Sequence, residues 1–202
     1  MNLELESLLK FYEQRKGEIK KFINICSYKD EECLFGELAF CICTPQSRAK
    51  YCREAINKLK ADGKLLIASK QDLISYLKGV RFPDVKAQRI VEAREKLPEL
   101  KSMLGKPELR EWLMENINGL GQKESAHFMR NIGFKGLPII DVHIQNFLVK
   151  IGKYGEQGSL TKKRYNELGD KFLELSKELK IPPEELDIAI WLYQSGEENF
   201  YG

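Results

Sequence analysis

Hydrophobic positions recur at intervals of three and four residues along almost the whole chain, which is the spacing of one face of an α-helix. Residues 3–25 follow this pattern, and residues 32–43 (ECLFGELAFCIC) are more uniformly apolar, as expected of a central buried helix. Further helices are predicted at 47–60, 71–78, 84–96, 107–116, 122–132, 142–150, 161–180 and 184–194. The pattern predicts an all-α fold, either one unit or two helical lobes with a cleft between them.

Two local signals predict helix starts. Thr44 stands before Pro45; threonine is a good N-cap and proline suits the first helical turn, so a new helix is expected there. In LPIIDVHI (137–144) an apolar approach ends at Asp141, which would cap a helix that begins at Val142. Asp141 can serve as a cap alone, or as a rigidly held carboxylate whose second oxygen faces a cleft.

Charge is unevenly distributed along the 202 residues. The net charge is +3, and residues 116–153 hold five basic side chains against two acidic ones, an excess as large as that of the whole chain. A polyanion would therefore bind around this segment. No stretch reaches the roughly 18 apolar residues of a membrane span, and the N-terminus has no secretory pattern. We expect no membrane partner and a cytoplasmic location.

The five cysteines all lie in the first quarter of the chain, at Cys26, Cys33, Cys41, Cys43 and Cys52. An odd number within apolar helical sequence predicts reduced, mostly buried thiols. They lack paired CxxC spacing, and with two histidines in the chain a three-histidine zinc site is excluded. We therefore expect no metal.

A glycine-rich corner, Asn118-Gly119-Leu120-Gly121, separates the helices predicted at 107–116 and 122–132. The glycines permit a tight turn, Leu120 would pack beneath it, and the first amides of the second helix could bind a phosphate. Glycines can also simply connect two packed helices. Lys123, however, falls in the first turn, where the helix dipole disfavours a cation. This placement favours a functional use, since burial of an amine promotes its neutral, nucleophilic form.

The stretch GLGQKESA, followed eighteen residues after its lysine by IIDVH, resembles the helix–hairpin–helix motif with its Gly/Pro-rich loop and aspartate found in base-excision DNA glycosylases. Together with RFPDVKAQRIVEAREKL, it is most similar to the type 2 8-oxoguanine DNA glycosylases. The resemblance covers about residues 35–195 and implies one glycosylase unit over 1–202 with two helical subdomains, the hairpin at about 107–132 and the aspartate loop at 133–141.

This resemblance implies a bifunctional enzyme of base excision repair that flips an oxidised guanine out of damaged double-stranded DNA. Lys123 would attack the anomeric carbon and form a Schiff base, and β-elimination would then cut the strand. Asp141 would stabilise the positive charge that develops on the sugar. No organic cofactor is implied, although the hairpin carbonyls of this superfamily can hold a monovalent cation.

The resemblance assigns further residues to DNA contacts. The phosphate would be bound at Gly119 and Gly121, with His143 as a second contact. Gln46 would fill the gap left by the flipped base, and His127, Phe82 and Trp191 would line the base pocket. Each of these four also has a structural reading: Gln46 as an exposed side chain, and the others as packing residues. His143 can equally be an ordinary surface or capping histidine.

Two departures from the related enzymes bear on specificity. Iron–sulfur relatives carry four cysteines after the aspartate, whereas every cysteine here precedes Lys123, so we expect no iron–sulfur cluster. Type 2 members often end in a lysine that helps to recognise the lesion, whereas this chain ends GEENFYG, with Glu197 and Glu198. Lesion range, opposite-base preference and the relative strength of excision and cutting therefore stay open.

Two other functions compete with this interpretation. A helix–hairpin–helix element can grip DNA without catalysis, which would require no pairing of Lys123 with Asp141 and would give equal affinity for damaged and intact duplex. A glycosylase for another oxidised base would keep the chemistry and change the substrate. For the repair enzyme we expect a monomer with no obligate protein partner, acting at the nucleoid.

Overall fold

The computed structural model describes residues 2–23, 26 and 28–196 of the chain. These residues form helices and contain no β-strand, which confirms the all-α prediction. None of the helices in this part of the chain is long and apolar enough to cross a membrane. The C-terminal residues Glu197 and Glu198 lie outside the described residues.

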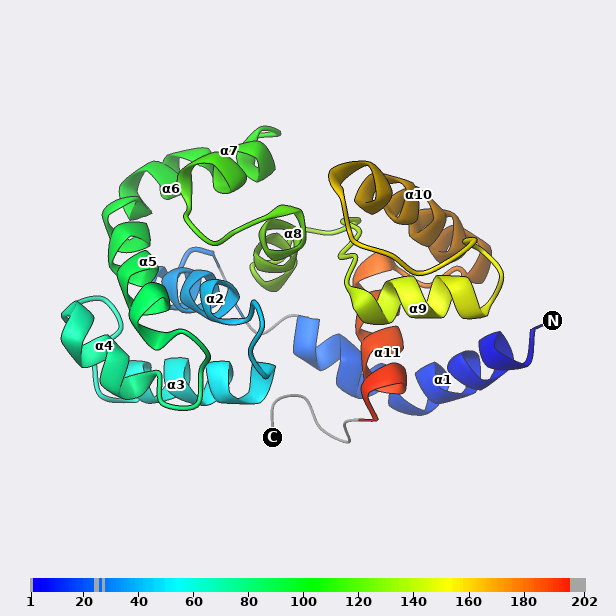
Figure 1. The fold of residues 1–202 in the computed structure, drawn as a ribbon, viewed down its shortest axis with the longest axis horizontal. Helices are drawn as coiled ribbons and strands as arrows, with labels where there is room; N and C mark the ends of the chain where they lie inside the picture. The colour runs from blue at the N-terminus through cyan, green and yellow to red at the C-terminus, as the bar shows by residue number, and fades with distance from the viewer. Residues whose placement is uncertain (1, 24–25, 27, 197–202) are drawn as a thin grey trace. The chain divides into compact units, whose positions relative to one another are not determined.

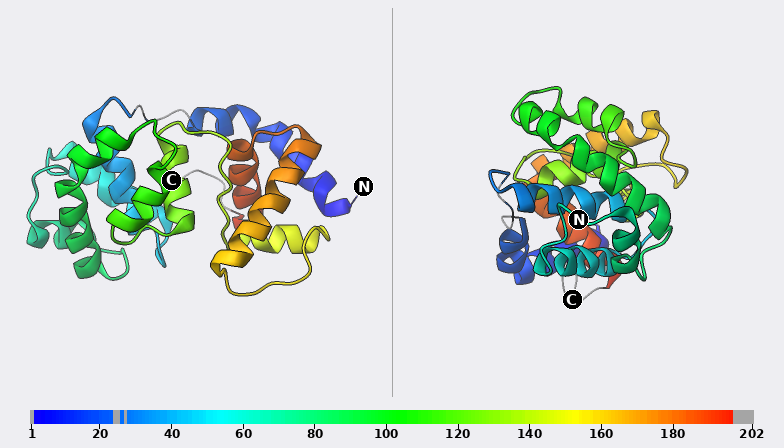
Figure 2. Two further views of the ribbon diagram at one scale, coloured as in Figure 1. Left: turned by 90° about the horizontal axis from the view of Figure 1, so that it is seen from above. Right: turned by 90° about the vertical axis from the view of Figure 1, so that its left-hand side faces the viewer.

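The helices divide between two compact units (Figures 1 and 2). Unit 1 holds α1 (Leu3–Ile23), the loop after Ile132, α9 (Val142–Lys150), α10 (Lys162–Leu179) and α11 (Pro183–Ser195). Unit 2 holds α2 (Glu31–Cys43), α3 (Ala49–Ala61), α4 (Lys70–Tyr76), α5 (Pro83–Glu95), α6 (Leu97–Met103), α7 (Leu109–Asn116) and α8 (Gln122–Asn131).

Each unit is built around one helix. In unit 2 every residue from Leu34 to Cys43 is buried, and α2 packs against α3, α5 and α8, which confirms the predicted central helix. In unit 1, α11 packs against α1, α9 and α10, and residues 184–190 of α11 are buried. Pro183 begins α11 and Gly196, in the left-handed region, ends it, as proline and glycine do at helix termini.

Two sequence predictions about local structure are wrong. Thr44 does not begin a helix: it ends α2, its amide donates to the Phe40 carbonyl, and its hydroxyl donates to the Cys41 carbonyl. The next helix begins at Ala49, after a turn. Helix α6, which begins at Leu97 directly after α5, was also not predicted. Pro98 lies in its first turn, where proline is tolerated.

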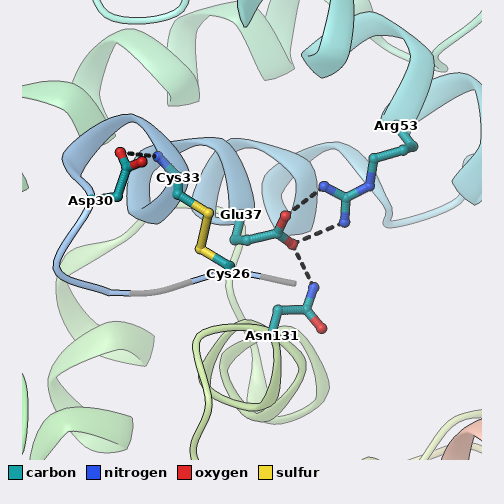
Figure 3. Close-up of a disulfide and its surroundings, with 6 residues drawn as sticks. All are labelled: Cys26, Asp30, Cys33, Glu37, Arg53 and Asn131. Carbon is teal, nitrogen blue, oxygen red and sulfur yellow. Dashed lines mark hydrogen bonds and ion pairs between the residues drawn. A yellow bond between two sulfur atoms is a disulfide. The ribbon is translucent and has the colours of Figure 1, made fainter. Parts of the chain in front are cut away.

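The expectation of reduced cysteines is wrong for two of the five, since Cys26 and Cys33 form a disulfide (Figure 3). The chain turns ahead of α2, where Asp30 caps the helix by accepting from the Cys33 amide at 3.0 Å. This turn brings the two Cα atoms to 5.9 Å, within the range that a disulfide spans. The other three cysteines are buried and free, as predicted.

A buried carboxylate joins α2 to α3 and α8 (Figure 3). Glu37 accepts from both terminal nitrogens of Arg53, at 2.5 and 2.9 Å, and from Asn131 Nδ2 at 2.7 Å. The Arg53 guanidinium also lies 3.8 Å from the centre of the Phe40 ring. Because a buried carboxylate is stable only when it is paired, this network fixes the C-terminal end of α8 on the central helix.

Candidate functional site

The hairpin between α7 and α8 turns as the sequence predicts. Gly119 has φ +98°, in the left-handed region that glycine favours, and Leu120 is buried beneath the turn. Gly121 is the extended N-cap of α8, and within the described residues no side chain caps this helix. The first helical bond runs from Ser125 N to the Gly121 carbonyl, so the preceding amides face outward at the positive end of the helix dipole.

Helix α5 supports the hairpin from one side. Asn118 Nδ2 donates to Glu92 at 2.9 Å, and the Arg89 side chain lies against Gly119. A Cβ atom at Gly119 would be 3.0 Å from Arg89 Cδ and Nη1, which is too close for ordinary contact. The backbone angle therefore favours glycine here, a larger residue would also require the Arg89 side chain to shift, and the Arg89 guanidinium of α5 lies beside the hairpin.

A backbone hydrogen bond closes the hairpin turn. The Ile117 carbonyl accepts one hydrogen bond, from Leu120 N at 3.1 Å, and a carbonyl oxygen has a second lone pair.

Lys123 is the second residue of α8, and its side chain is 32% exposed. Its Nζ lies 3.5 Å from Glu124 Oε1, while Glu124 Oε2 approaches the helix start at Gly121. An acid at this position complements the dipole that Lys123 opposes. Among the described residues, one long ion pair holds the lysine at the helix start, and about a third of its side chain is exposed.

His127 lies one turn after Lys123 and is buried, with 8% of its surface exposed. Its ring packs edge-on against Phe40 at 5.6 Å between centroids, and its Nε2 has no hydrogen-bond partner among the described residues. Burial, followed by the positive charges of Arg130 and Lys123, lowers the pKa of His127 well below its usual value. The imidazole is therefore neutral at pH 7 and packs within unit 2, and its contact with a flipped base stays a prediction.

Asp141 caps α9, as predicted. Its Oδ1 accepts from the amides of His143, at 2.9 Å, and Ile144, at 3.0 Å. Its backbone is extended, as an N-cap requires, and the helix bounds match those predicted at 142–150. One carboxylate oxygen therefore holds the helix, and the structure gives Oδ2 no hydrogen bond within the described residues.

The loop before Asp141 is anchored on α10. Tyr165 donates its hydroxyl to the Pro138 carbonyl at 2.9 Å and accepts from Ile140 N at 3.4 Å. A Cβ at Gly169 would lie 3.3 Å from the Pro138 ring, so the helix and the loop are in close contact. These contacts, together with the buried Ile140, fix where the Asp141 carboxylate lies within unit 1.

The other predicted residues fall in both units. In unit 1, His143 is half-buried in the first turn of α9, and Trp191 is half-buried in α11. In unit 2, Gln46 is exposed in the turn before α3, and Phe82 is 52% exposed at the N-cap of α5. Unit 2 also contains the hairpin and Lys123, whereas Asp141 belongs to unit 1.

Sequence reasoning missed two residues of α5, Lys86 and Arg89. Lys86 is buried, and it occupies the same helix face as Ile90 and Ala93, four and seven residues later. A lysine on an apolar face was the available signal. Arg89 carried none, because its contact with Gly119 joins residues thirty positions apart.

Comparisons with known proteins agree on one family. The family model for 8-oxoguanine DNA glycosylase matches residues 15–181. The chain is 35% identical over 192 residues to an 8-oxoguanine DNA glycosylase/AP lyase of Fusobacterium nucleatum, covering 90% of this chain and 88% of that protein. It superposes on the 8-oxoguanine DNA glycosylase of Thermotoga maritima with a TM-score of 0.86 at 28% identity, covering 97% and 98% of the two chains. A Methanocaldococcus jannaschii 8-oxoguanine glycosylase/lyase, crystallised with a 15mer DNA containing 8-oxoguanine, gives 0.83 at 30% identity, covering 96% and 100%.

Proposed function

The chain belongs to the 8-oxoguanine DNA glycosylase family, and we propose that it excises 8-oxoguanine from duplex DNA and then cuts the strand at the resulting abasic site. The observation that carries this proposal is Lys123, a partly exposed lysine in the first turn of α8, a helix that follows the hairpin without a side-chain cap, in a chain of this family. A lysine at that place opposes the helix dipole, which favours a functional use over a structural one.

We propose that the neutral amine of Lys123 attacks the anomeric carbon of the flipped nucleotide. The bond to the base breaks, and the base leaves with the bonding electrons and takes up a proton. The sugar ring opens to give a Schiff base on Nζ. Loss of a proton from the neighbouring sugar carbon then expels the 3′ phosphate by β-elimination, which cuts the strand.

The role proposed for Asp141 is electrostatic. Positive charge develops on the sugar as the base departs, and a fixed carboxylate stabilises that charge without having to reorganise. Capping supports this role, because the two amides that bind Oδ1 hold the carboxylate in one orientation. Oδ2 is the oxygen that would act.

Backbone amides around Gly119 and Gly121 would bind a DNA phosphate at the start of α8, with His143 as a second contact. The outward-facing amides at the uncapped end of α8 support this assignment. We further propose that the enzyme acts as a monomer on damaged double-stranded DNA, and therefore in the cytoplasm at the nucleoid.

Base release and DNA binding test this function together. Lys123→Gln should abolish release of 8-oxoguanine and strand cutting while duplex affinity stays within a fewfold of wild type. Lys10→Gln, which removes one exposed positive charge from α1, should leave both unchanged. Base release by Lys123→Gln at the wild-type rate would refute the proposal.

The same experiment separates the competing functions. If the wild type binds damaged and intact duplex equally and releases no base, the chain is a binding module. If it cuts an abasic duplex but leaves 8-oxoguanine in place, the chemistry is correct and the lesion is a different one.

A further inference from the structure

Lys86 of α5 is a buried lysine that the proposed chemistry does not use. The residue is 2% exposed, and its Nζ donates to the Cys43 carbonyl at 2.5 Å, the Pro45 carbonyl at 2.8 Å and Ser47 Oγ at 2.8 Å. All three hydrogens of the ammonium group thus bind the turn between α2 and α3. Burial lowers the pKa of Lys86, so this arrangement keeps a cation in a place where solvation is poor.

The acceptors around Lys86 are neutral groups. Burial raises the pKa of Cys43 to about 12 and that of Cys52 to about 11, so both are uncharged thiols at pH 7. Lys86 is therefore held by carbonyl and hydroxyl dipoles. An apolar side chain could fill the same volume without the cost of burying a charge, which indicates that the three directed hydrogen bonds are what the position provides.

The turn that Lys86 binds contains Gln46, an exposed residue with φ +57°. Phe82, which is also exposed and has φ +56°, is the N-cap of α5, and its carbonyl accepts the first helical backbone bond, from the Lys86 amide at 3.1 Å. Ser47 Oγ further accepts from the Arg81 amide at 3.0 Å. The Lys86 side chain thus binds the turn of Gln46 directly and is linked to the loop before Phe82 through Ser47 and the Arg81 amide. Each of these two loops presents one exposed residue in a left-handed conformation.

Left-handed backbone costs a non-glycine residue about 1–2 kcal/mol, and it persists only where the surroundings hold it. The two residues held in this way are an amide, which can hydrogen-bond a base edge, and an aromatic ring, which can stack on a base. Neither is buried, so packing of their own side chains does not explain the strain. The strain is explained if the two side chains must point outward in one fixed direction.

We propose that Lys86 is a positioning residue: it holds Gln46, and with it Phe82, in the orientation that separates the damaged base from its stack in duplex DNA. The inference rests on the proposed function. Gln46 and Phe82 would contact DNA, and Lys86 acts through them without touching the substrate. A rigid amide can replace the lost pairing contacts at the moment of extrusion, whereas a mobile loop would first have to be ordered.

This role predicts a dependence on substrate that a merely structural lysine would not have. Extruding a paired, stacked base costs a few kcal/mol, and the cost is least when the base is already unpaired. Loss of positioning should therefore slow excision from a paired duplex and leave an unpaired lesion nearly unaffected. For 8-oxoguanine opposite cytosine we expect a loss of about tenfold to a hundredfold, the range that small misplacements produce.

The test is single-turnover excision by wild type, Lys86→Met, Gln46→Ala and the double variant. One substrate carries 8-oxoguanine opposite cytosine, and the other carries it opposite a tetrahydrofuran abasic analogue, which leaves the lesion unpaired and cannot form a Schiff base. Lys86→Met and Gln46→Ala should each be slow on the first substrate and close to wild type on the second, and the double variant should be no slower than the slower single variant. Lys58→Met, which removes an exposed lysine from α3, is the matched control and should act like wild type.

Equal slowing of both substrates by Lys86→Met, full activity on both, or losses that multiply in the double variant would overturn the positioning role. If Lys86→Met does not fold, Ser47→Ala removes the hydroxyl that bridges Lys86 and Arg81 and should show the same dependence on pairing. Failure of the proposed function looks different, because the wild type itself would then release no 8-oxoguanine from either substrate, and the positioning role would fall with it.

Discussion

Asp141 combines two roles that substitution can separate. Its Oδ1 caps α9 through the amides of His143 and Ile144, and its negative charge is proposed to stabilise the sugar. Asp141→Asn keeps a carbonyl oxygen in the cap and removes the charge. Asp141→Ala removes both.

The two variants should therefore differ in stability and agree in activity. Asparagine caps about as well as aspartate, and replacing such a cap with alanine costs roughly 1 kcal/mol. Losing the charge at the helix start adds about 0.3–1 kcal/mol in both variants. We expect Asp141→Ala to melt about 2–4 °C below Asp141→Asn, since that is the shift per kcal/mol in a chain of this size. Base excision should fall at least about a hundredfold in both, as it does when a preorganised charge partner is lost.

Thermal melting and single-turnover excision, measured on the same preparations, check this separation. Thr161→Ala is the control: Thr161 caps α10 in the same unit, its Oγ1 accepting from Arg164 N at 3.3 Å. This variant should lose cap stability and keep wild-type excision. If Asp141→Asn excised at the wild-type rate, the charge would not be needed; if it melted with Asp141→Ala, the carboxylate would not act as a cap.

Three further outcomes follow from the geometry. Gly119→Ala should lower the free energy of unfolding, measured in urea, by about 1–2 kcal/mol because of the positive φ at this position, and crowding against Arg89 should lower it further. In the double variant with Arg89→Ala, only the loss caused by crowding should be recovered. Wild-type stability in Gly119→Ala would contradict this prediction. In denaturant without reductant three thiols should react, and five after reduction, because Cys26 and Cys33 are paired; five at the outset would disprove the disulfide. The pKa of His127 is lowered on folding, so the unfolded state binds a proton at a higher pH than the folded state does. The stabilising contribution of the neutral imidazole is therefore fully present above pH ~6.5. Below that pH the free energy of unfolding should fall by up to about 1.4 kcal/mol per pH unit, until the pKa of the folded state is reached. His127→Leu should flatten that slope in urea titrations, and an unchanged slope would refute it.

The sequence predicted the elements whose signals are local. Helix α9 was predicted with its observed bounds because Asp141 supplies a cap and the residues after it repeat at helical spacing. The buried helix α2 was predicted from its uniform apolarity. Helix α6 was missed because Pro98 reads as a break, although proline is tolerated in the first turn where it stands.

Features that depend on distant contacts could not be predicted. Thr44-Pro45 predicts a helix start because threonine and proline are both favoured there, whereas the Thr44 amide completes the last turn of α2. The left-handed backbone of Gln46 lies in a turn whose Pro45 carbonyl accepts from Lys86, forty residues beyond Gln46, so no local signal marks it. The site residues of both units were named from motif and resemblance, and their roles in catalysis stay predictions.

The central claim is that Lys123 is the nucleophile, and borohydride trapping tests it most directly. Wild type and Lys123→Gln are each mixed with a duplex carrying one 8-oxoguanine opposite cytosine, with an undamaged duplex and with an abasic duplex, in the presence of borohydride. We predict a covalent adduct with the 8-oxoguanine and abasic duplexes for the wild type, mapped by mass spectrometry to the peptide containing Lys123, and none for the variant or the undamaged duplex. An adduct of equal yield in Lys123→Gln, or one that maps to another lysine, would contradict the account.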